Sequence, residues 1–333
     1  MSEAGPDTER DPHRPWVMTA LAGIMLAAFA YLVFGPGFTI EFAGIGALLA
    51  LPFCLGALLT LGTRRYSPLG CFAAPILLGV VSYTLVALGA EGLICVVMVM
   101  PIWAIAGLGG GIAALAFGYL GDPSERDKDV GDVTLKSVGL AVVPFLLIYG
   151  DAAAPAQWER HAVARSIVIE APSETVWPRL VAIPDIASGE GTRNLTHDWL
   201  GVPRPTDARL ERRAGRTVRM AQWGDAVRFE EIVTRIEPGE SMAWRFAFPD
   251  DSVQNHTDRH IAPDGDLLRI EAGRYQLESL GADRTRVTLT TTYRTRTRFD
   301  WYFGWWGERL LGDVQDNVLA IVAQRSERAA ATR

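Results

Sequence analysis

The stretch SIVIEAPSETVW, residues 166–177, joins a β-strand to a short helix. These are the first two elements predicted for the second half of the chain. Ile167 and Ile169 alternate with smaller or polar residues, as expected of a strand. Pro172 ends this strand, and Ser173 is suited to cap the helix that follows. The pattern therefore predicts a strand followed at once by a helix.

A second short helical piece is predicted to begin at Pro184, and a series of strands follows it. These strands alternate apolar and polar residues and are separated by turns that contain glycine, proline or aspartate. The six further strands are expected at residues 207–213, 216–223, 227–236, 243–248, 267–277 and 284–296. Apolar residues then recur at helical spacing, which predicts a closing helix from Asp300 to Arg328. The soluble half is thus expected to be an α+β domain with an antiparallel sheet.

The order of these elements resembles the helix-grip superfamily, also called SRPBCC or START-like, which includes lipid-transfer domains and polyketide cyclases and dehydrases. The resemblance covers residues 162–329 and rests on the segments SIVIEAPSETVW (166–177), FEEIVTRIEPGESMAWRF (229–246) and YFGWWGERLLGDVQDNVLAIV (302–322). It implies a long C-terminal helix that lies across a curved antiparallel sheet. It also implies that the gap between sheet and helix holds an apolar ligand.

The first half of the chain consists of five apolar runs separated by short polar turns. A helix needs about 20 apolar residues to span a bilayer, and the first four runs reach this length. The fifth is shorter and contains Pro144. The runs lie at residues 15–34, 38–61, 68–89, 94–120 and 135–150. We therefore expect residues 1–150 to form an all-α transmembrane bundle of four to five helices, followed by a linker at 151–161.

Arginine and lysine residues flank these runs unevenly, which predicts an orientation in the membrane. They precede the first run (Arg10, Arg14), separate the second from the third (Arg64, Arg65), separate the fourth from the fifth (Arg126, Lys128), and occur at the start of the fifth (Lys136). The N-terminus is therefore expected on the cytoplasmic side of the plasma (inner) membrane. The soluble domain is extracytoplasmic if the fifth run spans the membrane, and cytoplasmic if it does not.

Composition and motifs argue against several classes of function. The formal net charge is −6, whereas nucleic-acid-binding domains usually carry a basic face. The three cysteines lie inside apolar runs and show no spacing typical of a metal site or a disulfide framework. The sequence contains no GxSxG, GxGxxG or Walker motif, so hydrolase and nucleotide functions lack support and no cofactor is expected.

Aromatic and amide side chains of the soluble half are the candidates for lining a ligand cavity. Asn317 lies on the apolar stripe of the last helix, where its amide needs either a hydrogen-bond partner or a cavity. The other candidates are Trp223, Trp244, Phe246, Tyr275, Tyr293 and Trp306. The same residues fit an ordinary core. The aromatic cluster at 299–306, which contains Trp306, fits either the end of the core or a mouth that touches the membrane interface.

His260 is the candidate for acid–base catalysis, because an imidazole titrates near neutral pH. The spacing of His256 and His260 in the sequence suggests a metal site. The segment containing them, however, is predicted to be a loop without defined ligand geometry. We therefore expect no metal. The glycine ridge from Gly107 to Gly118 fits packing within the bundle, or a homo-oligomer formed through this helix.

These observations give three functional hypotheses. The favoured one is a membrane-anchored binding protein, and not an enzyme, whose partners are the bilayer and a lipid, quinone or polyketide-like molecule. The second is a polyketide cyclase/dehydrase-type enzyme, which requires a titratable pair inside the cavity. The third is a structural or regulatory membrane protein without a ligand, which requires a filled interior.

Overall fold

The computed structural model of the chain consists of two compact units. It describes residues 14–34, 44–62, 68–89, 91–120, 130–257 and 261–332. One unit comprises residues 1–87 and 97–155, and the other comprises residues 88–96 and 156–333. The predicted domain limits, 1–150, 151–161 and 162–329, stay a prediction.

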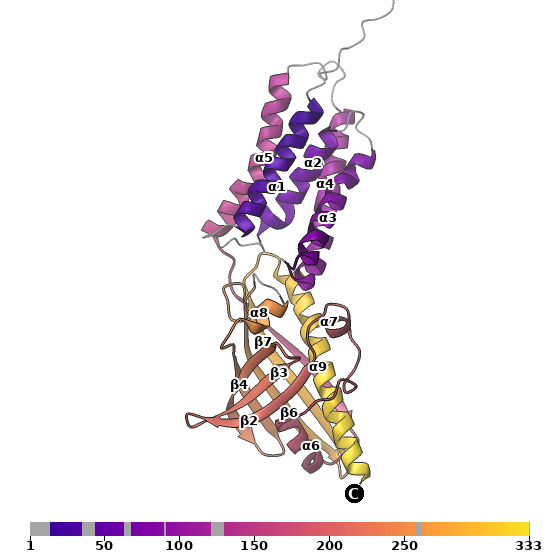
Figure 1. Cartoon of the computed structure of the whole chain (residues 1–333), viewed down its shortest axis with the longest axis vertical. Helices are drawn as coiled ribbons and strands as arrows, with labels where there is room; N and C mark the ends of the chain where they lie inside the picture. The colour runs from indigo at the N-terminus through magenta and orange to yellow at the C-terminus, as the bar shows by residue number, and fades with distance from the viewer. Residues whose placement is uncertain are drawn as a thin grey trace, which may run out of the picture. The chain divides into compact units, whose positions relative to one another are not determined.

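Helical structure occurs in each of the five apolar runs (Figure 1). The helices are α1 (Arg14–Phe34), η1 (Gly46–Ala50) followed by α2 (Leu51–Gly62), η2 (Pro68–Phe72) followed by α3 (Ala73–Ala87), α4 (Leu93–Leu120) and α5 (Val130–Ala153). Among the described residues, two helical stretches are long and apolar enough to cross a membrane, Leu69–Ala87 and Leu93–Ala116. The expected bundle of four to five membrane helices is therefore not confirmed.

Glycines of α4 let this helix approach its neighbours closely. A Cβ on Gly110 would overlap the carbonyl oxygen of Phe53 in α2, and a Cβ on Gly111 would overlap Cys71 in η2. The glycine ridge thus serves close packing within the chain. A homo-oligomer through this helix stays a prediction.

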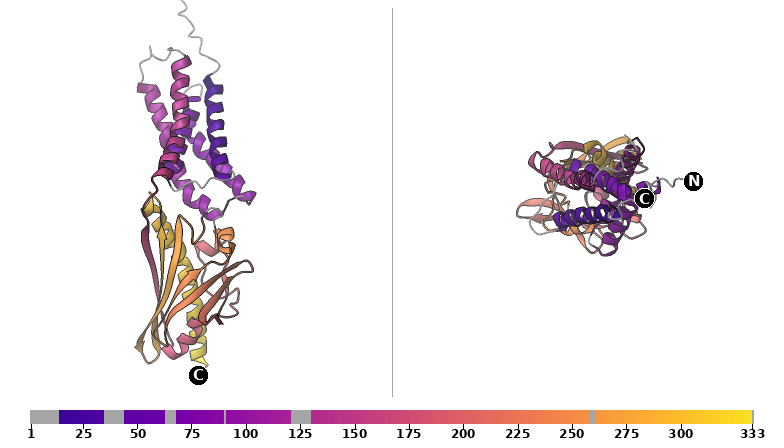
Figure 2. Two further views of the ribbon diagram at one scale, coloured as in Figure 1. Left: turned by 90° about the vertical axis from the view of Figure 1, so that its left-hand side faces the viewer. Right: turned by 90° about the horizontal axis from the view of Figure 1, so that it is seen from above.

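The second unit contains a seven-stranded antiparallel sheet in the order β1-β7-β6-β5-β4-β3-β2 (Figures 1 and 2). Its strands are β1 (Glu159–Ile169), β2 (Pro205–Arg213), β3 (Arg216–Trp223), β4 (Val227–Glu237), β5 (Ser241–Ala247), β6 (Leu268–Gly281) and β7 (Arg284–Thr295). This confirms the predicted α+β class, with its seven strands and its C-terminal helix α9 (Asp300–Ala331). The strand alternation is also as expected: in β7, Val287 and Leu289 are buried while Arg284 and Arg286 are exposed.

Helix α9 packs against β1 and β7, which are neighbours in the sheet. Gln315 fixes this contact, because its Nε2 donates to the carbonyl oxygen of Val163 in β1 at 3.1 Å and to Oγ1 of Thr291 in β7 at 2.9 Å. A single buried amide therefore holds the helix to two strands.

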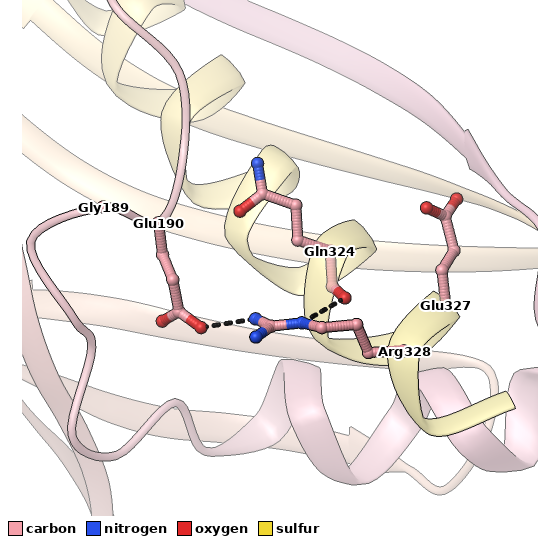
Figure 3. A pocket seen from close by; sticks show the side chains of 5 residues that line it. All are labelled: Gly189, Glu190, Gln324, Glu327 and Arg328. Atoms are coloured by element: carbon pink, nitrogen blue, oxygen red, sulfur yellow. Dashed lines mark hydrogen bonds and ion pairs between the residues drawn. The ribbon is translucent and has the colours of Figure 1, made fainter. Parts of the chain in front are cut away.

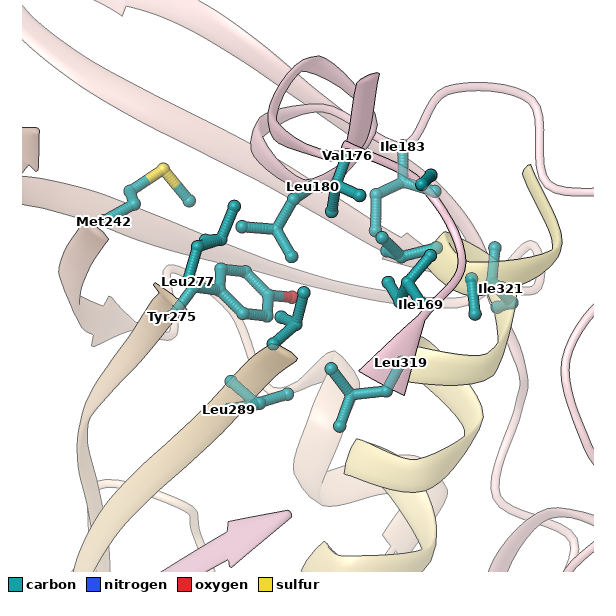
Figure 4. Close-up of a cluster of buried hydrophobic side chains, with 14 of the residues drawn as sticks. Ile169, Val176, Leu180, Ile183, Met242, Tyr275, Leu277, Leu289, Leu319 and Ile321 are labelled. Carbon is teal, nitrogen blue, oxygen red and sulfur yellow. The ribbon is translucent and has the colours of Figure 1, made fainter. Parts of the chain in front are cut away.

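The dense part of the core lies between the sheet, α6 (Ser173–Val181) and the C-terminal half of α9 (Figure 4). Burial of each large apolar side chain contributes about 1.5–3 kcal/mol, so this region stabilises the domain strongly. Its members include Ile169, Val176, Leu180, Ile183, Met242, Tyr275, Leu277, Leu289, Leu319 and Ile321.

The prediction of a second short helix beginning at Pro184 is wrong. Backbone N–H groups of this segment pair with the edge strand β2: Ile183 donates to Ala208 and Ile186 donates to Thr206, each at 2.8 Å. This edge pairing replaces the hydrogen bonds of a helix, and the short helix α7 forms later, at Leu195–Asp198. The expected loop after β5 also contains a helix, α8 (Ser252–Thr257).

Replacing Gly273→Ala is expected to destabilise the second unit by about 1–3 kcal/mol, because overpacking a buried site forces neighbouring atoms to move. Gly273 of β6 pairs with Trp244 of β5, and a Cβ at this position would overlap the indole ring. Gly189→Ala is the matched control, since a Cβ there meets no atom within 4 Å. Thermal unfolding of the full chain, followed by near-UV circular dichroism, measures the difference. Equal midpoints for the two variants would contradict the packing described.

Candidate functional site

A row of aromatic side chains crosses the inner face of the sheet from β3 to β6. Trp223 contacts Phe229 of β4 with ring centroids 5.4 Å apart, and Phe229 contacts Phe246 of β5 at 5.9 Å. Phe246 contacts Trp244 at 6.1 Å, and Trp244 contacts Tyr275 of β6 at 4.9 Å. We call these five residues the aromatic row. It brings together four of the residues predicted to line a cavity: Trp223, Trp244, Phe246 and Tyr275.

The two ends of the aromatic row differ in how tightly they are packed. Trp244 and Tyr275 are each 2% exposed and belong to the dense core. Trp223 and Phe246 are only partly buried, and they pack with Phe229 in a smaller cluster. The described members of that cluster come from β3, β4, β5, α8 and the turn before α8. The Trp223 end therefore presents aromatic surface that the dense core does not use.

A buried ion pair lies beside the row. Arg219 of β3 and Glu231 of β4 are directly opposite each other in the strand pairing, and they are 3% and 6% exposed. Arg219 Nε donates to the Glu231 carboxylate, and Nη1 donates to the carbonyl oxygen of Leu180 at 3.0 Å. The guanidinium carbon lies 4.8 Å from the ring centroid of Trp244 and 5.2 Å from that of Tyr275.

Burial alone would lower the pKa of Arg219, but the charge of Glu231 beside it raises that pKa above its ordinary value. Burial also raises the pKa of Tyr275, so its hydroxyl stays neutral. Through these contacts the Arg219 guanidinium joins β3, β4 and α6, so breaking the pair would leave an uncompensated buried charge. The sequence interpretation missed this pair.

The segment 183–204, which we call the strap, connects α6 to β2 and is fastened to α9. Asn317 of α9 holds its centre: Oδ1 accepts from the backbone N–H of Thr192 and from Nη1 of Arg204, each at 2.9 Å. Asn317 is 1% exposed. Of the two roles that the sequence left open for this residue, the structure shows a bond to neighbouring backbone. A ligand contact stays a prediction.

Helix α7, inside the strap, is fixed to α9 through Asp313. The backbone N–H and the hydroxyl of Thr196 both donate to Oδ2 of Asp313 at 3.0 Å. Nδ2 of Asn194 donates to the carbonyl oxygen of the same aspartate at 3.2 Å. These bonds fix the position of a helix too short to be stable alone.

Just before Thr192, the strap borders a polar pocket of about 400 Å³. The pocket is lined by Gly189, Glu190, Gln324, Glu327 and Arg328 (Figure 3). Glu190 accepts from Arg325 and Arg328, each at 2.6 Å. The hydrogen bond from Arg325 is the main cause that lowers the pKa of Glu190 to about 2. Because these charged groups satisfy one another, we interpret the pocket as a fastening between strap and helix.

His197 of α7 lies against the Trp223 end of the aromatic row. Its side chain is 7% exposed, and its ring centroid is 5.9 Å from that of Trp223. Nδ1 lies 3.0 Å from the carbonyl oxygen of Val202, and since a carbonyl only accepts, Nδ1 carries the proton. Burial is the main cause that lowers the pKa of His197, so the imidazole is neutral at pH 7. Its Nε2 is buried without a hydrogen-bond partner.

Further buried nitrogens of the interior also lack a partner: Trp244 Nε1, Trp306 Nε1 and Asn317 Nδ2. Trp306 is 7% exposed and lies seven residues, or two turns of α9, before Asp313, whose carboxylate accepts from Thr196 of α7 at 3.0 Å. Trp306 is therefore on the side of α9 that faces α7. Buried polar groups are nearly always hydrogen-bonded, so each of these three nitrogens, which come from β5 and from separate turns of α9, is an exception to that rule.

The remaining predicted site residues lie elsewhere. Tyr293 is 2% exposed, stacks on His161 with ring centroids 4.9 Å apart, and donates from its hydroxyl to the carbonyl oxygen of Gly304 at 3.3 Å. It does not belong to the aromatic row. His260 lies outside the described residues. That any of these side chains binds a ligand or acts in catalysis stays a prediction.

The aromatic cluster at 299–306 is partly exposed and partly buried, and a mouth at the membrane interface stays a prediction. Trp301 and Trp305 are 76% and 57% exposed, whereas Trp306 is buried. The described residues contain no group of three or more histidine, cysteine, aspartate or glutamate side chains that could hold a metal ion.

Comparisons with known proteins give structural neighbours only. No family model matches the sequence, and no curated protein matches it. Among solved structures, the Zhui aromatase/cyclase from Streptomyces sp. R1128 is 14% identical, covers 52% of this chain and 98% of its own, and has a TM-score of 0.33. Norcoclaurine synthase from Thalictrum flavum is 10% identical over 53% of this chain and 89% of its own, with a TM-score of 0.32. The di-domain ARO/CYC StfQ is 11% identical over 64% and 63%, with a TM-score of 0.34. At these identities and TM-scores, the similarity carries no information about activity.

Replacing Glu231→Gln is expected to destabilise the second unit by about 3–5 kcal/mol, because it leaves the buried Arg219 without its counter-charge. Glu211→Gln breaks an exposed pair with Arg213 and is expected to cost at most about 1 kcal/mol. The double variant Arg219→Met with Glu231→Leu should recover most of the loss. Urea unfolding of the full chain measures all three. A Glu231→Gln variant as stable as Glu211→Gln would show that the pair is not desolvated.

Glu190 is expected to make the strap sensitive to acid. Its pKa is lowered from 4.5 to about 2 in the folded chain, so its contribution is complete above pH 4.5 and is lost as the pH falls from 4.5 to about 2. The stability difference between the native chain and Glu190→Gln should therefore be constant above pH 5 and shrink below it. Thermal midpoints measured between pH 3 and 7 check this. A difference that grows on acidification would contradict the assignment.

Proposed function

We propose that this chain is a membrane-anchored binding protein that holds a hydrophobic small molecule on the aromatic row, between the sheet, the strap and α9. The observation that carries the proposal is the Trp223 end of the row. Its rings are partly exposed, and next to them lies His197, a buried polar side chain with an unpaired nitrogen. Apolar walls with a few unpaired polar atoms are the composition of a small-molecule site.

Membrane anchoring is supported by the exposed apolar surface of two helical stretches within residues 69–116. The two stretches that could span a membrane are only 28% and 17% buried, although their mean hydropathies are 2.0 and 2.2. Large apolar side chains such as Leu69, Ile76 and Ile105 are 78%, 64% and 73% exposed. Exposed apolar surface of this extent marks a membrane or protein interaction site, and the lengths of the two stretches favour a membrane. We further propose the orientation predicted from the arginines and lysines, with the N-terminus in the cytoplasm.

The test compares two Ala→Phe variants on opposite faces of the sheet. Ala221 of β3 is 5% exposed and packs with Phe229, so Ala221→Phe adds a ring at the Trp223 end of the aromatic row. Ala243 of β5 is the control, because it alternates with the inward-facing Met242 and Trp244. The full chain is purified from a membrane extract, and bound molecules are identified by native mass spectrometry and organic extraction.

We expect an apolar molecule to accompany the native chain and Ala243→Phe, and its amount to fall at least about tenfold in Ala221→Phe, as expected when a pocket is overfilled. Circular dichroism is used to check that both variants fold. A native chain that is empty, and stays empty after incubation with a total lipid extract, would contradict the proposal and favour a structural or regulatory role.

A cyclase/dehydrase-type enzyme is the second candidate. The observation that favours it is the neutral imidazole of His197, because an unprotonated nitrogen can act as a general base. The same extraction separates the two functions. An enzyme should yield two related molecules that differ by a reaction such as loss of water, whereas a carrier should yield one.

A further inference from the structure

The unpaired Nε2 of His197 has a defined chemical character. Nδ1 is committed as a donor to the carbonyl oxygen of Val202 at 3.0 Å, so Nε2 of the neutral ring carries a lone pair and can only accept. A 180° rotation of the imidazole about the Cβ–Cγ bond would break the hydrogen bond to Val202. A fixed acceptor selects a ligand group that donates, and it disfavours a carbonyl or carboxylate, whose lone pairs would face its own.

The surroundings determine where the donor must come from. His197 is 7% exposed, and Nε2 is shielded from solvent. The ring is packed edge-on against Trp223, at an interplanar angle of 70°. A partner for Nε2 must therefore be a group inside the domain, next to an aromatic wall.

The backbone around His197 is held firmly enough to present the nitrogen in one place. Its N–H donates to Oδ1 of Asn194 at 2.8 Å, and the preceding Thr196 is bonded to Asp313 of α9. Arg204 pairs with the following Asp198 at 2.8 Å. The acceptor is thus preorganised, which reduces the entropy lost when a ligand binds.

From this geometry we infer that the site recognises an aromatic or similarly flat apolar molecule that carries a hydroxyl group, with the hydroxyl donating to Nε2 of His197 and the ring packing on Trp223. This inference rests on the proposed function and specifies the ligand class. A phenol meets both requirements. Its methyl ether has the same ring but no donor.

The experiment uses 1-naphthol and 1-methoxynaphthalene as probes of the full chain in lipid nanodiscs, with empty nanodiscs to correct for partition into lipid. 1-Naphthol is expected to bind about three- to tenfold more tightly than its ether, the range expected of one hydrogen bond. With ¹⁵N-labelled histidine, the Nε2 resonance of His197 should move on addition of 1-naphthol and stay in place with the ether. Loss of that resonance in a His197 variant assigns it.

Two substitutions distinguish loss of the Nε2 acceptor from disruption of the fold around residue 197. His197→Asn can place an amide nitrogen near the position of Nδ1 and keep the bond to Val202, but it has no atom at Nε2, so the preference for 1-naphthol should fall to about one. His197→Gln can place an amide oxygen near Nε2 and should keep the preference. His256→Asn is the control, because His256 is exposed and makes a similar Nδ1 bond, to Ser252 at 2.9 Å.

The outcomes distinguish the inference from the proposed function. If both probes bind equally and the Nε2 resonance does not move, a water molecule satisfies His197 and the inference is overturned, while the binding function stands. If neither probe binds and the chain is also empty when purified, the proposed function fails and the inference fails with it.

Discussion

The hydrogen bonds between Asn317 and the strap are the constraint on which the arrangement of α7, the strap and α9 depends. Helix α9 lies on β1 and β7, whereas the strap pairs with β2 at the opposite edge of the sheet. One oxygen of Asn317 joins them by accepting from Thr192 and Arg204. Gly191 shows how close this approach is: a Cβ there would overlap that oxygen, and its φ of +93° favours glycine. The wall that carries His197 therefore depends on a buried amide.

The interior divides into a dense core and a smaller cluster at the Trp223 end whose rings are partly exposed. Leu180, Tyr275 and Leu319 belong to the dense core, where burial of apolar area offsets the entropy lost on folding. The Arg219–Glu231 pair lies beside Tyr275 and connects β3, β4 and α6 through one guanidinium. Such a pair contributes little net stability but is costly to break, so it specifies how these elements meet. The Trp223 end can then keep partly exposed rings and unpaired polar atoms without unfolding the domain.

Periodicity predicted the strands and α9 because each is long and has one buried face, as with Val287 and Leu289 against Arg284 and Arg286. It failed for the strap, whose conformation is set by pairing with β2 and by side chains of α9 far away in sequence. No local pattern around Pro184 encodes those partners.

The candidate site was only partly predictable for a related reason. The arginine-rich strands made every charged position look exposed, so Arg219 and Glu231 were missed. The alternation did contain the signal, because Arg219 is two residues from the buried Ala221 and Glu231 is two from the buried Phe229. In the sequence, His197 is marked only by its neighbour Asp198. Its significance comes from Val202 and Trp223, which the chain brings to it by folding.

Under the proposed function, joining the two units gives the binding domain access to a ligand that is scarce in water. A flat apolar molecule is scarce in water and concentrated in the bilayer, so a soluble carrier would meet it rarely. Joining the binding domain to a membrane unit raises the effective concentration of site and ligand without any added contact. The site can then accept apolar molecules of various shapes and still select those that carry a hydroxyl group. An acceptor fixed beside an aromatic wall meets this need, because lipid chains that fill the same space offer no donor to His197.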